Sequence, residues 1–237
     1  MIRYNDHILY RNHDDRTDLP YVYYIKGEKL ALMVDAGNSP ASYHAFIQEL
    51  EEEGLKEPDL MVLSHWHWDH TFGLPAVKCP VIASEKTDAY LEKAMAWEWN
   101  EEAMLERLAA GEDIEFCHEK MHEEFSDITA IQVRRPDIVF EGTMHIDLGG
   151  VPVILQTIDT PHTRDAVMVY LPEDRILFAA DAEYEDYYDN NSMYDPLRLQ
   201  NYITYLENLD FEIYMRGHDD TAIPKENILQ LLKDAQI

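Results

Sequence analysis

Cysteine is scarce in this chain, which contains Cys79 and Cys117 among its 237 residues. Two cysteines allow at most one disulfide, so a disulfide framework is excluded. Neither cysteine belongs to a Cys-x-x-Cys pair, the spacing typical of cysteine-based zinc sites. We therefore expect any metal site in this protein to use other ligands.

Long apolar runs are also absent. No window approaches the roughly 18 apolar residues that a membrane-spanning helix needs. Residues 1–7, at the N-terminus, lack the apolar segment of a signal peptide. The sequence therefore predicts no membrane partner, and the cytoplasm is the expected compartment.

Basic residues are few, since 19 Lys and Arg face 47 Asp and Glu and the formal net charge is −28. Proteins that bind nucleic acids usually carry a basic patch, which this composition disfavours. Strongly anionic substrates are disfavoured as well, unless bound metal ions reverse the local field. We expect a small-molecule substrate and no nucleic-acid partner.

Apolar residues make up 46% of the chain, which suits a globular protein with a sizeable core. Short apolar segments bounded by turn residues predict strands, and Ser39-Pro40 predicts the start of a helix that ends near Gly54. A helix is also expected from Lys86 to about Gly111. The strand-like segments are residues 21–25, 30–34, 59–63, 80–83, 144–148, 151–155, 166–171, 175–180 and 213–218.

The most informative stretch is residues 63–73, which hold three histidines and an aspartate within six positions. His65 and His67 directly follow a strand-like segment. Residues two apart in extended backbone point the same way, so these imidazoles can bind one metal ion. Asp69 and His70 lie on the following turn and can reach a second ion. Imidazole suits zinc, copper, iron and nickel, and a carboxylate completes such a site.

A second histidine motif, residues 118–122, matches the His-Glu-x-x-His pattern of zinc proteases. On a helix, His118 and His122 would share a face, with Glu119 as a general base. The segment is charged, and no third ligand follows at a family spacing. We therefore favour a chance match over a catalytic site.

Further polar residues stand at the ends of other predicted strands. These residues are Asp35, His162, Asp181 and His218. Loops carry function when a rigid scaffold directs them to one place. We therefore expect these residues to meet the histidine-rich loop.

The His-x-His-x-Asp-His motif of residues 65–70, followed in order by these later residues, resembles the metallo-β-lactamase superfamily of metallo-hydrolases. The resemblance covers most of the chain and extends to the glyoxalase-type and lactonase-type branches. It implies an α/β fold, a four-layer αβ/βα sandwich of two mixed β-sheets with outer helices. The metal ions would lie at one edge of that sandwich.

We expect a single domain over residues 1–237, with a mainly helical insertion at about 86–145. The insertion would form a lid, a wall of the substrate site, or a homodimer surface through Trp97 and Trp99. Core packing by Trp97 and Met104 is an equally open interpretation.

The resemblance also implies the ligands of two metal ions. His65, His67 and His162 would bind the first ion, Asp69, His70 and His218 the second, and Asp181 would bridge both. Asp35 would support these ligands from behind, unless it is a simple turn residue. Two Zn²⁺ ions are expected because the ligands are rich in nitrogen, with manganese or iron as other options.

The implied reaction is hydrolysis, in which a metal-bridging hydroxide attacks an ester, thioester, lactone or related bond. Asp69 would also be catalytic, by stabilising the leaving group or carrying its proton. Tyr184 resembles a tyrosine that contacts the substrate carbonyl in the lactonase branch, although Tyr187 and Tyr188 make a chance match an open alternative.

Some features separate this chain from its relatives. The histidine-cysteine ligation of many true β-lactamases is missing, so antibiotic hydrolysis is not expected. Pro161, Arg164 and Ala180 depart from the usual residues beside the ligands and would change the pocket wall. Arg164 would bind a substrate carboxylate or pair with Asp165.

Two other functions compete with hydrolysis. The first is a mononuclear iron oxidoreductase on the same fold, resembling persulfide dioxygenases, in which two histidines and an aspartate hold the iron. The second is a binding module without catalysis. The complete set of seven candidate ligands favours two metal ions and a catalytic site.

Overall fold

The computed structural model describes residues 1–188, 190 and 192–236. Its first β-sheet follows chain order, with antiparallel pairing from β1 to β4 and parallel pairing from β4 to β7. The strands of this sheet are β1 (Ile2–Arg3), β2 (Ile8–Arg11), β3 (Val22–Lys26), β4 (Ala31–Val34), β5 (Leu60–Val62), β6 (Val81–Ser84) and β7 (Ile138–Phe140).

The second sheet has the strand order β13-β12-β11-β10-β9-β8, and β11 and β12 are its one parallel pair in the described residues. Its strands are β8 (Thr143–Asp147), β9 (Pro152–Thr157), β10 (Val167–Leu171), β11 (Ile176–Ala180), β12 (Ile213–Arg216) and β13 (Ile223–Pro224). The predicted hairpin is confirmed, because β8 pairs with β9 around Gly149 and Gly150.

Seven helices belong to the described residues. They are α1 (Pro40–Glu52), α2 (Trp68–Thr71), α3 (Glu85–Met95), α4 (Glu101–Ala110), α5 (Glu115–Glu124), α6 (Pro196–Asn208) and α7 (Lys225–Asp234), with 3₁₀ turns at Leu74–Ala76 and Ile128–Ala130. The predicted start of α1 is confirmed: the Ser39 side chain accepts a hydrogen bond from the Ser42 backbone N–H, and Pro40 is the first helical residue.

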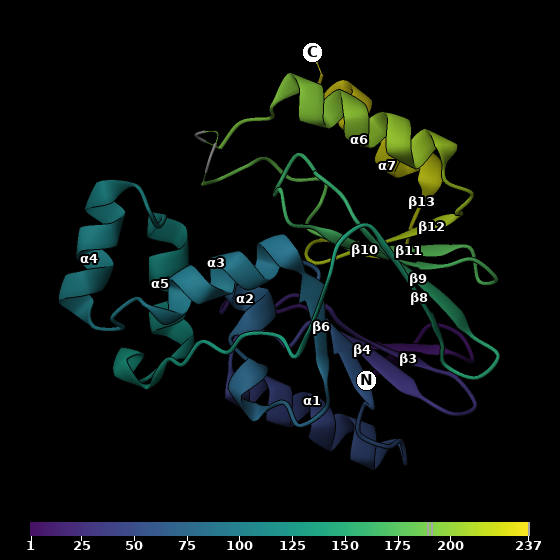
Figure 1. Cartoon of the computed structure of the whole chain (residues 1–237), viewed down its shortest axis with the longest axis horizontal. Helices are drawn as coiled ribbons and strands as arrows, with labels where there is room; N and C mark the ends of the chain where they lie inside the picture. The colour runs from purple at the N-terminus through teal and green to yellow at the C-terminus, as the bar shows by residue number, and fades with distance from the viewer. Residues whose placement is uncertain (189, 191, 237) are drawn as a thin grey trace.

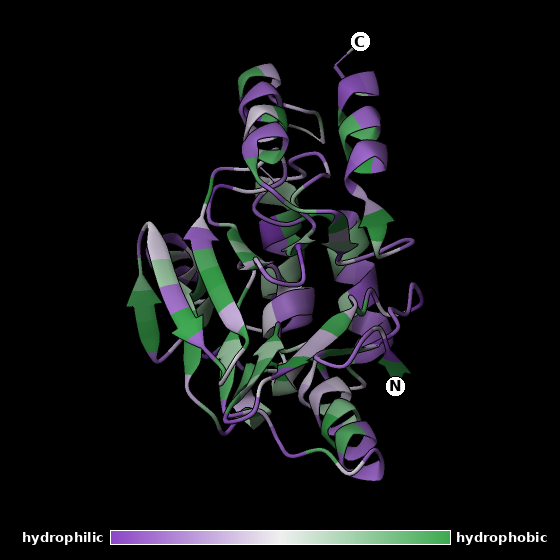
Figure 2. Ribbon diagram, turned by 90° about the vertical axis from the view of Figure 1, so that its right-hand side faces the viewer, coloured by the Kyte–Doolittle hydropathy of each residue, from purple (hydrophilic) through white to green (hydrophobic). Residues whose placement is uncertain are grey.

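The core follows from the two-residue period of the strands. In β3, Tyr23 and Ile25 face the second sheet, whereas Val22 and Tyr24 face α1. The same alternation on the other sheet packs one face of β10 and β11 against α6 and α7. Figure 2 shows hydrophobic residues concentrated in the strands and hydrophilic residues along the outer helices.

Figure 1 shows the resulting layers, with α1 below the first sheet and α6 and α7 above the second. The predicted four-layer sandwich of two mixed sheets with outer helices is therefore confirmed. α4 and α5 project from one side of it (Figure 1).

The prediction of one helix from Lys86 to about Gly111 is wrong, because the chain bends between α3 and α4. Asn100 begins α4, and its side chain accepts a hydrogen bond from the Ala103 backbone N–H at 3.0 Å. The Arg107 guanidinium lies 4.8 Å from the ring centroids of both Trp97 and Trp99. Trp97 and Trp99, the two residues proposed for a dimer surface, thus pack against Arg107 inside the bend.

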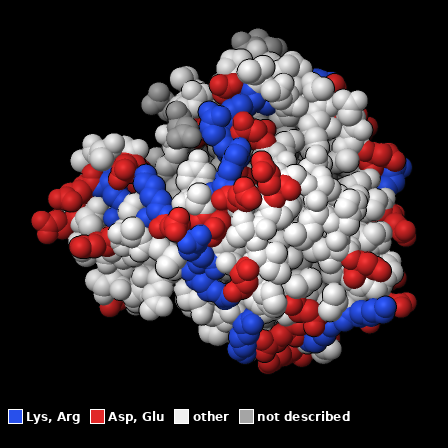
Figure 3. All heavy atoms as spheres, viewed as in Figure 1, with Lys and Arg blue, Asp and Glu red and all other residues white. Residues whose placement is uncertain are grey.

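The distribution of charged side chains on the surface agrees with the small number of basic residues in the sequence. On the face drawn in Figure 3, the Lys and Arg side chains lie next to Asp and Glu side chains rather than in a broad basic area. Among the described residues, no helix has the length and apolar character needed to span a membrane.

Candidate metal centre

The predicted site residues follow strand ends at one edge of the two sheets. They are Asp35 after β4, His65 and His67 after β5, Asp69 and His70 in α2, His162 between β9 and β10, Asp181 after β11, and His218 after β12. All are buried except His218, which is partly exposed. The structure therefore brings together every metal ligand that the sequence predicts.

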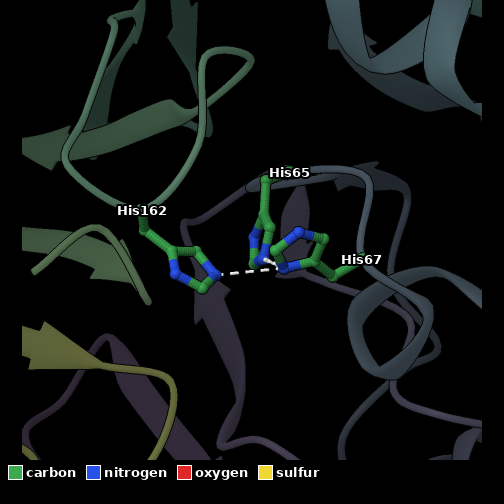
Figure 4. A group of neighbouring side chains, drawn as sticks. All are labelled: His65, His67 and His162. Atoms are coloured by element: carbon green, nitrogen blue, oxygen red, sulfur yellow. Dashed lines mark hydrogen bonds between the residues drawn. The ribbon is translucent and has the colours of Figure 1, made fainter. Parts of the chain in front are cut away.

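The first group consists of three histidines whose ring nitrogens converge, as Figure 4 shows. Nε2 of His65 lies 2.9 Å from Nδ1 of His67, and Nε2 of His162 lies 3.0 Å from the same atom. The three rings belong to two loops that are far apart in sequence. Each ring directs a nitrogen toward one shared point.

The outer nitrogen of the His162 ring is fixed by the protein. Nδ1 of His162 donates a hydrogen bond to the Glu185 carbonyl oxygen at 2.8 Å, so its hydrogen is on Nδ1. Burial lowers the pKa of His162, which keeps the ring neutral. A neutral ring with its hydrogen on Nδ1 leaves a lone pair on Nε2, which is the state that binds a metal ion.

The second group combines two histidines and two carboxylates. Nε2 of His70 lies 2.9 Å from Oδ2 of Asp69 and 3.2 Å from Oδ2 of Asp181. Nε2 of His218 lies 3.1 Å from the same oxygen of Asp69. The ligand atoms of these four residues all lie within 4.8 Å of one another.

Asp181 connects the two groups. Its Oδ2 is 3.6 Å from Nε2 of His218 and 3.9 Å from Nε2 of His162. Its Oδ1 is buried and has no hydrogen-bond partner in the described part of the chain. A buried carboxylate oxygen without a partner is costly, and a cation beside it would remove that cost. The donor set and this oxygen therefore fit two metal ions.

The electrostatics of the two groups differ. Burial and the charge of His70 hold the pKa of His65 well below its ordinary value. Burial also disfavours charge on His70, but the carboxylates of Asp69, Asp181 and Asp35 outweigh it and raise the pKa of that ring well above its ordinary value. The carboxylates thus stabilise positive charge in the second group, as they would stabilise a bound cation.

Asp35 holds the second group from behind. Its Oδ2 accepts a hydrogen bond from Nδ1 of His70 at 2.8 Å, and its Oδ1 accepts one from the Ser64 backbone N–H at 2.7 Å. Ser64 Oγ is in turn 3.0 Å from Nδ1 of His65. Asp35 thus lies behind the predicted ligands and contacts His70 directly, which agrees with the expected supporting position.

A cavity of about 490 Å³ opens onto both groups. Its walls are largely aromatic and apolar, and five of the predicted ligands lie on its surface. The lining residues are Asp18, His67, Asp69, Ile114, Phe116, Cys117, His162, Asp181, Tyr184, Tyr187, Tyr188, Ser192 and His218. The predicted role of residues near 86–145 as a substrate wall thus agrees with the position of α5 beside the cavity.

Tyr184 lines this cavity, with its ring centroid 6.2 Å from that of His162. Its hydroxyl donates a hydrogen bond to Oδ2 of Asp219 at 2.7 Å and accepts one from Arg216 at 3.3 Å. The ring is therefore in reach of a bound molecule, while its hydroxyl hydrogen is directed to Asp219. Arg164 lies 3.7 Å from Asp159 and is outside the described cavity lining.

Sequence reasoning missed Asp18, a further carboxylate in the cavity. The loop before β3 turns back on itself through pairing of Asp14 with Leu19, and this turn places Asp18 3.9 Å from Nδ1 of His218. Burial and the charge of Asp69 raise the pKa of Asp18 to about 7. Asp18 follows no strand end, so no pattern in the sequence separates it from the neighbouring Asp14 and Asp15.

Comparison with known proteins agrees with this geometry. Residues 16–224 match the family model described as "Metallo-beta-lactamase superfamily". A Methanocaldococcus jannaschii protein named "Probable metallo-hydrolase" is 32% identical over 74 residues, which is 30% of this chain and 35% of that protein. The alignment thus spans about a third of the length of this relative.

Solved structures share the fold at low sequence identity. A metallo-beta-lactamase from Pontibacter korlensis has a TM-score of 0.62 at 19% identity, covering 98% of this chain and 97% of that one. A superfamily protein from Sulfolobus tokodaii has a TM-score of 0.60 at 20% identity, covering 96% and 85%. A sec-alkylsulfatase from Pseudomonas sp. has a TM-score of 0.67 at 14% identity, covering 99% of this chain but 40% of that protein.

Proposed function

The chain belongs to the metallo-β-lactamase superfamily, and from this membership we propose that it is a metal-dependent hydrolase acting on an ester, thioester, lactone or related bond. One observation carries the proposal. Two groups of ligand atoms lie side by side, share Asp181, and open into a cavity of small-molecule size.

We assign seven side chains to two metal ions. His65, His67 and His162 would hold the first ion, Asp69, His70 and His218 the second, and Asp181 both. Zinc is the metal we propose because five of the seven ligands are imidazoles, those of His65, His67, His70, His162 and His218. When bound, the two ions would supply a nucleophile from water near neutral pH and positive charge for the leaving group.

The chain's own residues would position this chemistry. Asp35 and the Glu185 carbonyl fix the orientation of His70 and His162. Oδ2 of Asp69 lies between His70 and His218 at the cavity surface, and we propose that it passes a proton to the leaving group. Each of these contacts is made by a buried or largely buried side chain, which keeps the geometry rigid.

The cavity wall narrows the substrate class. Phe116, Tyr187 and Tyr188 offer apolar surface that would exclude water and cover a substrate. No Lys or Arg belongs to the lining that the structure describes, and Asp18 adds a carboxylate. This arrangement supports an uncharged, partly apolar substrate rather than a polyanion.

The decisive experiment measures metal identity and stoichiometry on protein purified without added metal. Two zinc or manganese ions at the cavity ligands, with one of them lost in a His67→Ala variant and both retained in His145→Ala, would support the proposal. His145 is the matched control because it is an exposed histidine on β8. Esters, thioesters, lactones, β-lactams and sulfate esters would then be tested as substrates.

Two outcomes would overturn the proposal. A single iron per chain would redirect the work to the oxidoreductase alternative, with persulfides as test substrates. A metal-loaded protein without activity on any member of the panel would favour a binding module.

A further inference from the structure

A second group of metal-binding side chains lies between α4 and α5. His118 and His122 stand one turn apart on α5, and their ring centroids are 4.6 Å apart. Glu101, the first residue of α4, faces them. We propose that Glu101, His118 and His122 bind one divalent transition-metal ion, with zinc as the probe of choice.

The distances support a shared ion. The ligand atoms of the three residues all lie within 4.8 Å of one another. Oε2 of Glu101 is 2.9 Å from Nε2 of His122, and its Oε1 is 3.5 Å from Nε2 of His118. Two imidazoles and one carboxylate form a donor set that zinc uses with a fourth, solvent position. One ion would therefore complete the site with a water molecule.

His118 provides an independent observation. Its Nε2 atom is buried and makes no hydrogen bond within the part of the chain that the structure describes. Buried polar atoms normally have a partner, and the charged group that faces this nitrogen is the Glu101 carboxylate, at 3.5 Å. Glu101 thus lies close to His122 but too far from His118 to satisfy its nitrogen with a hydrogen bond, and an ion between the three side chains would do so.

The helices that carry the three ligands are fixed by packing. Met104 on α4 and Cys117 and Met121 on α5 are buried in one hydrophobic cluster with Trp68 and Phe72 of the α2 region. The backbone that carries the three ligand side chains is therefore held in place by this packing. Little reorganisation would be needed when an ion binds.

This arrangement differs from a protease site. Glu119, the expected general base of the His-Glu-x-x-His pattern, is exposed and is not among the three clustered ligands. The third ligand, Glu101, comes from the preceding helix instead of from a later segment. The site would link α4 to α5, and Phe116 and Cys117 of α5 line the large cavity. An ion here would therefore stabilise one wall of that cavity.

The test is the zinc content of the full-length protein after equilibration with excess Zn²⁺ and desalting. We expect three zinc ions in the unmodified protein and the loss of one in His118→Ala and in His122→Ala. Glu119→Ala is the matched control on the same helix and should keep three. Glu101→Gln, a conservative change at an exposed position, should lose the same ion without disturbing the fold.

The outcomes separate this site from the cavity ligands. His67→Ala should keep the ion held by His118 and His122 while losing the first ion at the cavity. A zinc content that is the same in the unmodified protein, in His118→Ala and in Glu101→Gln would overturn the proposal. If the cavity assignment failed instead, one ion would remain, and that ion would be sensitive to His118→Ala.

Discussion

A Cβ atom added at Gly217 would lie 1.9 Å from Oδ1 of Asp181. The two residues directly follow the neighbouring parallel strands β11 and β12, and the Gly217 backbone N–H donates a hydrogen bond to the Ala180 carbonyl at 2.9 Å. The close approach is therefore built into the sheet. A side chain at position 217 can be accommodated only if Asp181 moves away from its present place.

We predict that Gly217→Ala reduces the metal content at the cavity, because Asp181 is the carboxylate shared by both ligand groups. The measurement is metal per chain after purification. Gly142→Ala is the control, since its added Cβ meets nothing within 4 Å while its positive φ costs about 1 kcal/mol of stability. Full metal content in Gly217→Ala would show that Asp181 does not need its present position.

Asp35→Asn tests the support behind His70. Asparagine keeps the shape of the side chain and tolerates the positive φ at this position. It replaces one carboxylate oxygen by an NH₂ group, whereas Oδ2 of Asp35 accepts hydrogen bonds from the His70 ring and the Ser64 hydroxyl. We predict that metal affinity falls about 10- to 100-fold. Asp59→Asn is the control, because Asp59 accepts a backbone hydrogen bond from Ala31 at a strand start. A competition titration with a chelator measures the metal affinity of both variants. Equal metal affinities of Asp35→Asn and Asp59→Asn would contradict the prediction.

The seven candidate ligands were accessible to sequence reasoning because strand ends share an edge. Short apolar segments bounded by turn residues indicated the strands, and the resemblance to the superfamily identified the polar residues near their ends as ligands. His65 and His162 are 97 positions apart in the chain, yet both lie 3.0 Å or less from Nδ1 of His67. The pattern located the residues, and parallel and antiparallel pairing brought them together.

Other features depend on contacts that leave no local pattern. Asp18 reaches the cavity through a turn whose conformation is fixed by pairing of Asp14 with Leu19. The bend between α3 and α4 depends on the packing of Trp97 and Trp99 on Arg107. Helix α6 is a different case, because Asp195 and Pro196 form a local N-terminal helix signal in the sequence.

Removal of the metal ions should destabilise the protein. Without cations, Asp69 and Asp181 rely on protonated His70 and His218 for compensation. We predict that a chelator lowers the melting temperature, since a ligand present at about 1,000 times its Kd contributes about 4 kcal/mol of stability. The melting temperature should recover when Zn²⁺ is returned. An unchanged value, with metal loss verified, would contradict the assignment of these residues as ligands.

The metal-free protein should also lose stability as pH rises above neutrality. Burial disfavours charge on His218, but the carboxylates of Asp181 and Asp69 outweigh it and raise its pKa to about 9, against 6.5 for an ordinary histidine. A folded-state pKa above the unfolded value gives stability that is complete below about 6.5 and is lost as pH rises through 9. Thermal melts across this range measure the effect. The fall in melting temperature with rising pH should be smaller in His218→Gln and unchanged in His145→Gln.

Tyr184 provides the sharpest test of a contact with substrate. Its hydroxyl hydrogen is donated to Asp219, so it can reach a substrate oxygen only by leaving that carboxylate. We predict that Tyr184→Phe keeps its metal ions but loses about tenfold in kcat/KM, which corresponds to about 1.4 kcal/mol. Asp219→Gly removes the competing acceptor and suits the positive φ at that position, so it should retain or raise activity. Equal activity in Tyr184→Phe, Tyr187→Phe and the unmodified enzyme would show that the Tyr184 hydroxyl plays no part.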